Sequence, residues 1–168
     1  MASKLKLNEV VLQSPNGLVE KSISMGDDGV VKVNGVQVAD IVSGTFTPFI
    51  FGTTTVGTAT YSNQLGSYTK IGNRVFVDIY IGWSSHTGTG NIRIGGLPFN
   101  SASTVVKGTC LIQSYSVSSP ANTFIIGQAF PGSSVIQVLY QVLGGGAWAE
   151  FPITVSGTFA LSISYEAD

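Results

Sequence analysis

The side chains that could carry acid–base or nucleophilic chemistry are scarce in this sequence, which contains one histidine, His86, and one cysteine, Cys110. A serine or cysteine hydrolase needs a histidine beside its nucleophile and a third group that orients the histidine. His86 lies within the Ser/Thr/Gly-rich residues 84–90, which we interpret as a loop tip that no strand holds in position. We therefore expect an exposed or hydrogen-bonded loop histidine and not a catalytic base.

Glycoside hydrolysis requires only a pair of carboxylates. After residue 43 the sequence offers four of them, Asp78, Glu150, Glu166 and Asp168. The last two stand at the end of the sequence, and no pattern places Asp78 and Glu150 at a catalytic separation. We expect Asp78 to pair with Arg74 or Arg93, or to mark a solvated edge. The sequence therefore predicts no catalytic residues and no enzymatic activity.

No metal or cofactor site is predicted either. One histidine and one cysteine cannot form a zinc site of the usual four-ligand kind. Residues 87–91 resemble a phosphate-binding loop only superficially, because the glycine spacing fails at Arg93 and no Lys-Ser/Thr pair follows. We interpret them as a hairpin tip. Cys110 lies in an apolar stretch, residues 109–112, where we expect a small buried hydrophobe.

Two tryptophans, Trp83 and Trp148, allow two interpretations. Each could anchor a core or an interface, which is the favoured interpretation because large aromatic side chains are readily buried. Alternatively Trp83, His86 and Trp148 could belong to surface-recognition loops, since exposed aromatic rings are common on carbohydrate-binding surfaces.

Charged residues make up only 10% of the 168 residues, and the formal net charge is -1. A protein that binds nucleic acid by neutralising phosphates needs clustered Lys and Arg, so no nucleic-acid partner is expected. No apolar run reaches the roughly 18 residues of a membrane-spanning helix, so no membrane insertion is expected. A single cysteine cannot form an intramolecular disulfide, which fits synthesis in a reducing cytoplasm.

The charges are distributed unevenly, which divides the chain. Nine of the 17 charged residues precede Ser43. We therefore predict an N-terminal arm over residues 1–43 and one further domain over residues 44–168.

The arm contains short β-prone pieces at residues 10–12, 17–19 and 30–38. Residues 31–38 alternate apolar and polar side chains on both sides of Asn34-Gly35, which predicts a hairpin with a type I′ turn. An isolated hairpin is marginally stable, so the arm needs a partner surface. We expect it to bind that partner through its apolar residues, Leu5, Leu7, Val10, Val11, Leu12, Leu18, Val19, Val31, Val33, Val36 and Val38.

The longer region reads as all-β: a single β-sandwich domain, jelly-roll-like, that follows the N-terminal β-hairpin arm. The predicted strands cover residues 59–61, 65–71, 74–83, 91–94, 104–113, 123–129, 134–143 and 155–165. In residues 75–81 aliphatic side chains alternate with Phe76, Asp78 and Tyr80, which predicts one core face. Phe76 and Tyr80 make the opposite face only partly polar, which fits a subunit interface, a second buried layer or a loop folded over the sheet.

Three segments resemble a pattern that recurs in tailed-phage virion proteins, mainly tail fibres and related surface appendages. They are Gly44-Thr45-Phe46-Thr47-Pro48, residues 66–77 around Tyr68-Thr69-Lys70-Ile71-Gly72-Asn73, and Gly95-Gly96-Leu97-Pro98-Phe99. The resemblance implies virion structure, no catalytic residues and a homotrimer. It also implies a protein made in the host bacterial cytoplasm and located on the virion surface.

The compact chain lacks a repetitive shaft, which favours a capsid decoration (cement) protein. Its arm would clamp the major capsid protein and stabilise the assembled shell. One alternative is a short tail fibre or receptor-binding tip, with the arm joined to tail or baseplate proteins and the loops in contact with host-surface glycan. Another is a carbohydrate-binding module outside any phage context, which predicts a monomer with a saturable sugar site.

Overall fold

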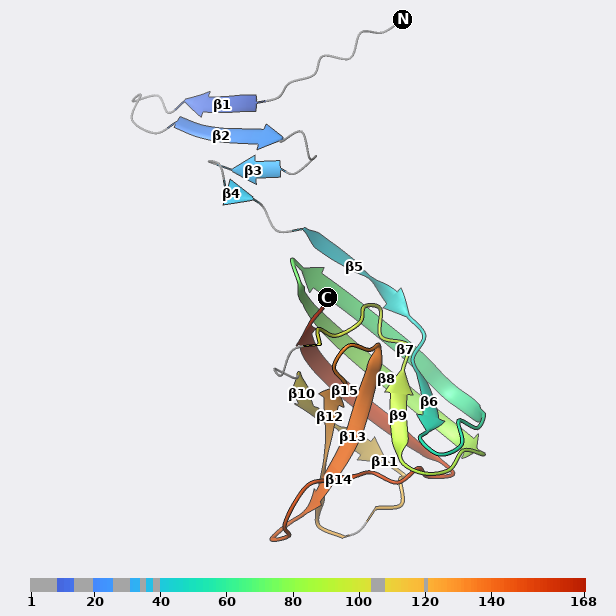
Figure 1. The fold of residues 1–168 in the computed structure, drawn as a ribbon. Coiled ribbons are helices and arrows are strands. Elements are labelled where there is room, and N and C mark those ends of the chain that lie inside the picture. The colour runs from blue at the N-terminus through green and yellow to red at the C-terminus, as the bar shows by residue number, and fades with distance from the viewer. Residues whose placement is uncertain are drawn as a thin grey trace, which may run out of the picture. The chain divides into compact units, whose positions relative to one another are not determined.

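A computed structural model describes residues 9–13, 20–25, 31–33, 36–37, 40–103, 108–119 and 121–168. The chain divides into two compact units, Met1–Asp40 and Ile41–Asp168. Each unit is an antiparallel β structure, and each is described by itself (Figure 1).

The N-terminal unit contains a four-stranded sheet in the order β1-β2-β3-β4. The strands are β1 (Glu9–Gln13), β2 (Glu20–Met25), β3 (Val31–Val33) and β4 (Val36–Gln37). The predicted strand at 10–12 and the pairing of the 31–38 hairpin are confirmed, since Val33 lies opposite Val36. The turn between β3 and β4 and the predicted strand at 17–19 lie outside the described residues.

Ile23, Val31 and Val33 lie on one face of this small sheet. Ile23 lies opposite Val33, and residues two apart on a strand share a face. All three side chains are exposed, at 44%, 41% and 40% respectively. The described part of the N-terminal unit therefore presents an apolar face of three partly exposed side chains.

The larger unit is a sandwich of a five-stranded and a six-stranded sheet, which confirms the predicted fold class. The first sheet has the order β11 (Gln113–Tyr115), β15 (Gly157–Glu166), β8 (Arg74–His86), β7 (Ala59–Ile71), β5 (Ile41–Phe46). The second has the order β10 (Thr109–Leu111), β12 (Thr123–Ala129), β13 (Val135–Val142), β9 (Ile92–Gly95), β6 (Phe49–Gly52), and β14 (Ala149–Glu150) also pairs with β13. In the described part of the chain, no helix is long and apolar enough to cross a membrane.

The core lies between the two sheets and comes from alternate residues of the strands. On β8, Val75, Val77, Ile79 and Ile81 are buried, as the alternation predicted. On β15, Phe159, Leu161, Ile163 and Tyr165 are buried in the same way. Burial of these side chains is the main favourable term in the folding of this unit.

The chain passes from one sheet to the other at both lateral margins. Between β5 and β6 it crosses at Thr47 and Pro48, and the Pro48 carbonyl accepts a hydrogen bond from Gln64 Nε2 at 3.0 Å. Between β10 and β11 it crosses at Ile112, which is buried. Each margin therefore joins the sheets covalently.

The unit boundary lies three residues before the predicted one, which was placed after Ser43. Strand β5 begins at Ile41, which lies opposite Ile71 of β7. The density of charged residues falls after Asp40, but the composition of the next three residues could not show that they pair with β7.

The three segments of the virion-protein pattern, together with Phe49 directly after the first of them, contribute three cross-strand glycine–aromatic pairs. The pairs are Gly44 with Tyr68, Gly66 with Phe46, and Gly95 with Phe49. A Cβ atom on Gly66 would lie 2.7 Å from the ring of Phe46, which is too close for a real contact. Glycine is needed there because the ring lies across its backbone, and the pairs help to hold the register.

Candidate functional site

The outer face of the five-stranded sheet holds the candidate site. Residues directly opposite one another in antiparallel strands share a face, so the strand register arranges their side chains in rows. One row is Thr45, Ser67, Asp78 and Ser162, and the next is Leu65, Tyr80, Ala160 and Gln113. All of these residues line an open groove of about 950 Å³.

Strand β15 forms the floor of the groove because its outward side chains are small. Ala160 and Ser162 face outward, whereas Phe159, Leu161 and Ile163 between and beside them are buried. This alternation of large and small residues is visible in the sequence. Ala160 and Ser162 join the site only through the pairing of β15 with β8 and β11, which sequence spacing does not reveal.

Tyr80 supplies the aromatic surface of the groove. Its side chain is 41% exposed, and Leu65, directly opposite on β7, is 61% exposed. Phe76 lies on the same face of β8 and is 48% exposed, but it does not line the groove. The structure thus places Phe76 and Tyr80 on the solvent-facing side, as predicted, while their role in a subunit interface stays a prediction.

Asp78 is the charged residue among the described residues that line the groove. Its Oδ1 accepts a hydrogen bond from Ser162 Oγ on the neighbouring strand. The predicted pairing of Asp78 with Arg74 or Arg93 is wrong, because among the described residues the one ion pair joins Arg93 to Glu150. The register of β8 against β15 therefore places Asp78 beside the hydroxyl of Ser162.

Glu150 lies on the outer face of the other sheet and accepts hydrogen bonds from three side chains. Asn91 Nδ2 and Arg93 Nη2 each lie 2.6 Å from a carboxylate oxygen, and Gln137 Nε2 lies at 2.5 Å. The hydrogen bond from Arg93 is the main cause that lowers the pKa of Glu150, against a smaller opposing effect of burial. Since Asp78 lies on the opposite sheet, the two carboxylates do not face one another across one site.

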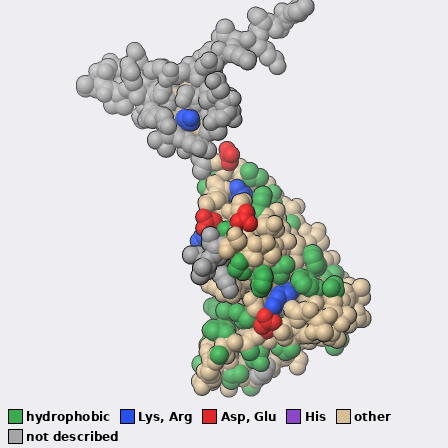
Figure 2. Space-filling model, in the orientation of Figure 1, with side chains coloured by type: hydrophobic (Ala, Val, Ile, Leu, Met, Phe, Trp, Pro, Cys, Tyr) green, Lys and Arg blue, Asp and Glu red, His purple; other side chains and the backbone are tan. Residues whose placement is uncertain are grey.

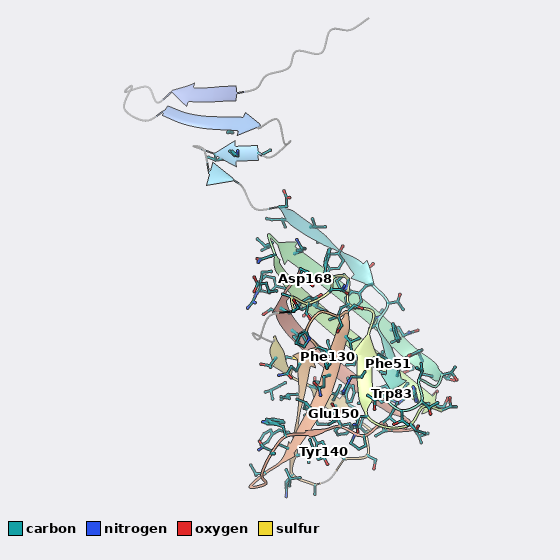
Figure 3. All side chains as sticks on the ribbon, viewed as in Figure 1. Phe51, Trp83, Phe130, Tyr140, Glu150 and Asp168 are labelled. Atoms are coloured by element: carbon teal, nitrogen blue, oxygen red, sulfur yellow. The ribbon has the colours of Figure 1, made fainter. Side chains whose placement is uncertain are left out.

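This ion pair is easily found on the molecular surface. Figure 2 shows few charged side chains on the face that it draws, and the adjacent red and blue spots in its lower half lie where Figure 3 labels Glu150. Hydrophobic and uncharged polar side chains surround them. Among the described residues, no group of three or more His, Cys, Asp or Glu is placed to hold a metal ion.

Trp83 belongs to the core, so its alternative interpretation as a surface-recognition residue is wrong. It is 3% exposed, and its ring packs edge-on against Phe159 with centroids 5.2 Å apart. Its Nε1–H donates to the carbonyl of Thr154 at 3.2 Å. The favoured interpretation of this tryptophan as an anchor of the core is therefore confirmed.

His86 also differs from the prediction of a loop tip, because it is the last residue of β8 and lies opposite Ala59. It is 8% exposed, which excludes it as a surface-recognition residue. Its Nδ1 accepts a hydrogen bond from the Gly88 amide at 2.8 Å, and Nε2 is buried with no partner among the described residues. The strand continues this far because Ser85 pairs with Thr60, to which its hydroxyl also bonds at 3.0 Å.

Trp148 and Cys110 lie around the six-stranded sheet. Trp148 is 45% exposed and lines a shallow pocket together with Cys110 and Leu139. Cys110 is partly buried against the core, and burial raises the pKa of its thiol to about 11. The thiol therefore stays protonated and poorly nucleophilic at neutral pH.

The predicted partner-binding residues of the arm are described only in part. Val31 and Val33 lie on the exposed apolar face of the small sheet, while Val10, Val11, Leu12 and Val36 are placed in its strands by the backbone. Outside the described residues lie Leu5, Leu7, Leu18, Val19 and Val38.

Comparison with known proteins gives a structural match and no sequence match. No family model and no curated protein sequence matches this chain. The crystal structure of the Dettilon tailspike protein matches 76% of this chain with a TM-score of 0.62 and 18% sequence identity. This chain spans 24% of the length of that tailspike, and at such identity the match establishes a shared fold.

Proposed function

We propose that this chain is a structural protein of a tailed-phage virion, part of a tail-side appendage of the tailspike or short-fibre kind. The observation that carries the proposal is the fold shared with a tailspike protein over 76% of the chain. In this proposal the N-terminal unit attaches the protein and the sandwich projects from the particle.

The proposal is supported by the residues that carry the resemblance to phage virion proteins. Each segment supplies a residue to a glycine–aromatic pair, in which Gly44 lies opposite Tyr68, Gly66 opposite Phe46, and Gly95 opposite Phe49, the residue after the first segment. Those glycines are required by the close approach of the rings, so the pattern marks one way of joining β5, β6, β7 and β9. A pattern with this structural reason is a better guide to fold than similar composition.

Attachment through the N-terminal unit is supported by its exposed apolar face. Ile23, Val31 and Val33 are each at least 40% exposed, and a small four-stranded sheet gains stability when such a face is covered. We therefore assign the partner-binding role to this face, with a tail or baseplate protein as the partner.

A tail location is favoured over capsid decoration. The compact size of the chain suggested a cement protein bound to the major capsid protein, but size alone does not distinguish a capsid from a tail. The structural neighbour is named as a tailspike, and no comparable observation favours the capsid.

The homotrimer implied by the resemblance is part of the same proposal. Sedimentation equilibrium of the full chain should then give a mass three times that of the 17.5 kDa chain. A mass equal to that of one chain over the whole concentration range would contradict the trimer.

The location is tested by gold-labelled antibodies raised against the sandwich and applied to intact virions. Label confined to the tail is the expected result. Label distributed over the head would instead establish capsid decoration, and particles without label would contradict a virion role.

The attachment surface is tested by incorporating variants into virions. The double change Ile23→Ser and Val33→Ser should abolish incorporation, whereas Lys32→Ala, which alters the opposite face of the same sheet, should not. Thermal unfolding of the sandwich should be the same in both variants. Equal incorporation of both would contradict the assignment.

A further inference from the structure

The outer edge of strand β6 has no role in the proposed function. Strand β6 ends the six-stranded sheet, and β9 is its neighbour on the inner side (Figure 1). A strand at the end of a sheet presents a row of unpaired N–H and C=O groups, to which a strand of another chain can pair. In β6, groups of the same chain occupy much of this row.

Tyr61 of β7 bonds to both backbone groups of Ile50 at this edge. Its hydroxyl accepts a hydrogen bond from the Ile50 N–H at 2.9 Å and donates one to the Ile50 carbonyl at 3.4 Å. A neighbouring strand would offer Ile50 the same two bonds. Burial raises the pKa of the Tyr61 hydroxyl above 10.0, so the hydroxyl keeps its proton at neutral pH and both bonds persist.

The backbone groups on either side of Ile50 are occupied as well. Gln64 Nε2 donates to the Pro48 carbonyl at 3.0 Å, and the Gly52 N–H donates to the Val56 carbonyl at 3.1 Å. In an antiparallel ladder, alternate residues turn their N–H and C=O groups to the same side, and residues 48, 50 and 52 alternate in this way. Four successive backbone groups at this edge therefore have partners from the same chain.

An extra residue in β7 brings the two covering side chains to the same face. The pairing of β7 with β8 shifts between Tyr61 and Asn63, where β7 has one residue more than β8. In a regular strand, residues three apart lie on opposite faces, but one extra residue restores the same direction. Tyr61 packs against the core, and Gln64 reaches the buried Pro48. Both side chains therefore point inward, where they meet β6.

We propose that Tyr61 and Gln64 form a cover over the edge of β6 that excludes a strand of a second copy of this protein. An added strand would need the position of the Tyr61 hydroxyl, 2.9 Å from the Ile50 nitrogen. Edge-to-edge pairing is a common route by which β proteins aggregate. The inference concerns the sandwich alone and does not depend on the proposed function.

The first test is amide hydrogen exchange of the full-length protein, measured by NMR. Tyr61→Phe keeps the ring and removes the hydroxyl, so the exchange rate of the Ile50 amide should rise about tenfold or more. Tyr68→Phe is the matched control, since the Tyr68 hydroxyl, on the same strand, has no partner among the described residues. It should change the Ile50 rate by less than about twofold. The amide of Val138, within the same sheet as β6, should keep its wild-type rate in both variants.

The second test removes the cover. In the double variant Tyr61→Ser with Gln64→Ala, the mass from sedimentation equilibrium should rise with protein concentration and exceed that of the wild type, whatever oligomer the wild type forms. Tyr68→Ser is the control, because Tyr68 also packs against the core from β7 but lies over Gly44 of β5. This control should have the wild-type mass at every concentration.

The opposite outcomes are equally definite. A wild-type exchange rate of the Ile50 amide in Tyr61→Phe, or an equal rise at Val138, would overturn the proposal. Wild-type mass in the double variant would also overturn it. Equal association of the double variant and Tyr68→Ser would do the same, because lost packing and not an open edge would then be the cause. If the double variant does not fold, the exchange rates in Tyr61→Phe decide the question by themselves.

Discussion

The two outer faces of the sandwich hold their polar groups in different ways. On the six-stranded sheet, Glu150 accepts hydrogen bonds from Asn91, Arg93 and Gln137. On the five-stranded sheet, Asp78 accepts one from Ser162. The carboxylate of Glu150 is thus held on both oxygens by neighbouring side chains, whereas that of Asp78 is held on one by Ser162.

The two carboxylates also differ in what their loss would leave behind. Arg93 is 9% exposed, and removal of its partner would leave a buried charge unpaired. Asp78 and Ser162 are exposed, so water can replace whatever they lose. Glu150, which neutralises Arg93, has partners on both carboxylate oxygens, whereas among the described residues Asp78 has a partner on one.

The largest loss of stability is expected from a substitution in the core between the two sheets. Trp83→Ala removes a side chain that is 3% exposed, and such a cavity costs about 3–5 kcal/mol of unfolding free energy. Trp148→Ala, at a tryptophan that is 45% exposed, should cost about 1 kcal/mol or less. Urea unfolding of the two variants measures the contrast, and equal losses would contradict the assignment of Trp83 to the core.

The next largest loss of stability is expected at Glu150, on the outer face of the six-stranded sheet. Glu150→Ala should destabilise the sandwich by about 2 kcal/mol, because it leaves the Arg93 guanidinium and two amide donors without their acceptor. Replacement of both charges, Arg93→Met with Glu150→Leu, should recover much of that loss. If the double variant is as unstable as the single one, the unpaired charge is not the cause.

The same carboxylate should make stability depend on pH. The pKa of Glu150 in the folded state lies below its ordinary value of 4.5, mainly through the hydrogen bond from Arg93. Its contribution is therefore fully present above that ordinary value and is lost as the pH falls through the lower folded-state pKa. The difference in urea midpoint between the wild type and Glu150→Gln should be larger at pH 7 than at acidic pH. A difference that grows on acidification would refute this.

The smallest effect is expected on the other outer face. Ser162→Ala and Asp78→Asn should each change the unfolding free energy by about 0.5 kcal/mol or less, as exposed substitutions usually do. Thermal unfolding at neutral pH checks this. Losses comparable to that of Glu150→Ala would remove the distinction between the two faces.

The fold was largely predictable because its main signals are local. Alternation identified residues 74–83, 123–129 and 134–143 as strands, and the structure has β8, β12 and β13 there. Strand β2 could not be predicted because Ile23 stands among polar residues. Strands β5 and β6 could not be predicted because Gly44 and Pro48 are typical of loops. Those strands exist because a neighbour pairs with them, which is a long-range effect.

Only the residues that the candidate site takes from strand β8 could be predicted from the sequence. Phe76 and Tyr80 were identified as outward residues from the alternation on β8. Ser162, Ala160 and Gln113 join Tyr80 or Asp78 only through pairings of β15 with β8 and β11. Sequence spacing carries no information on which strands are neighbours, so the groove could not be assembled from it.

The position of β5 has a mechanical consequence for the proposed appendage. Any tension that reaches the sandwich from its N-terminal side enters at Ile41, the first residue of β5, which has six residues opposite β7. A pull along this strand loads its cross-strand hydrogen bonds together in shear, since they run perpendicular to the strand. Beyond Phe46 the chain enters the other sheet through the buried Pro48, so the load is passed to both layers instead of peeling one edge.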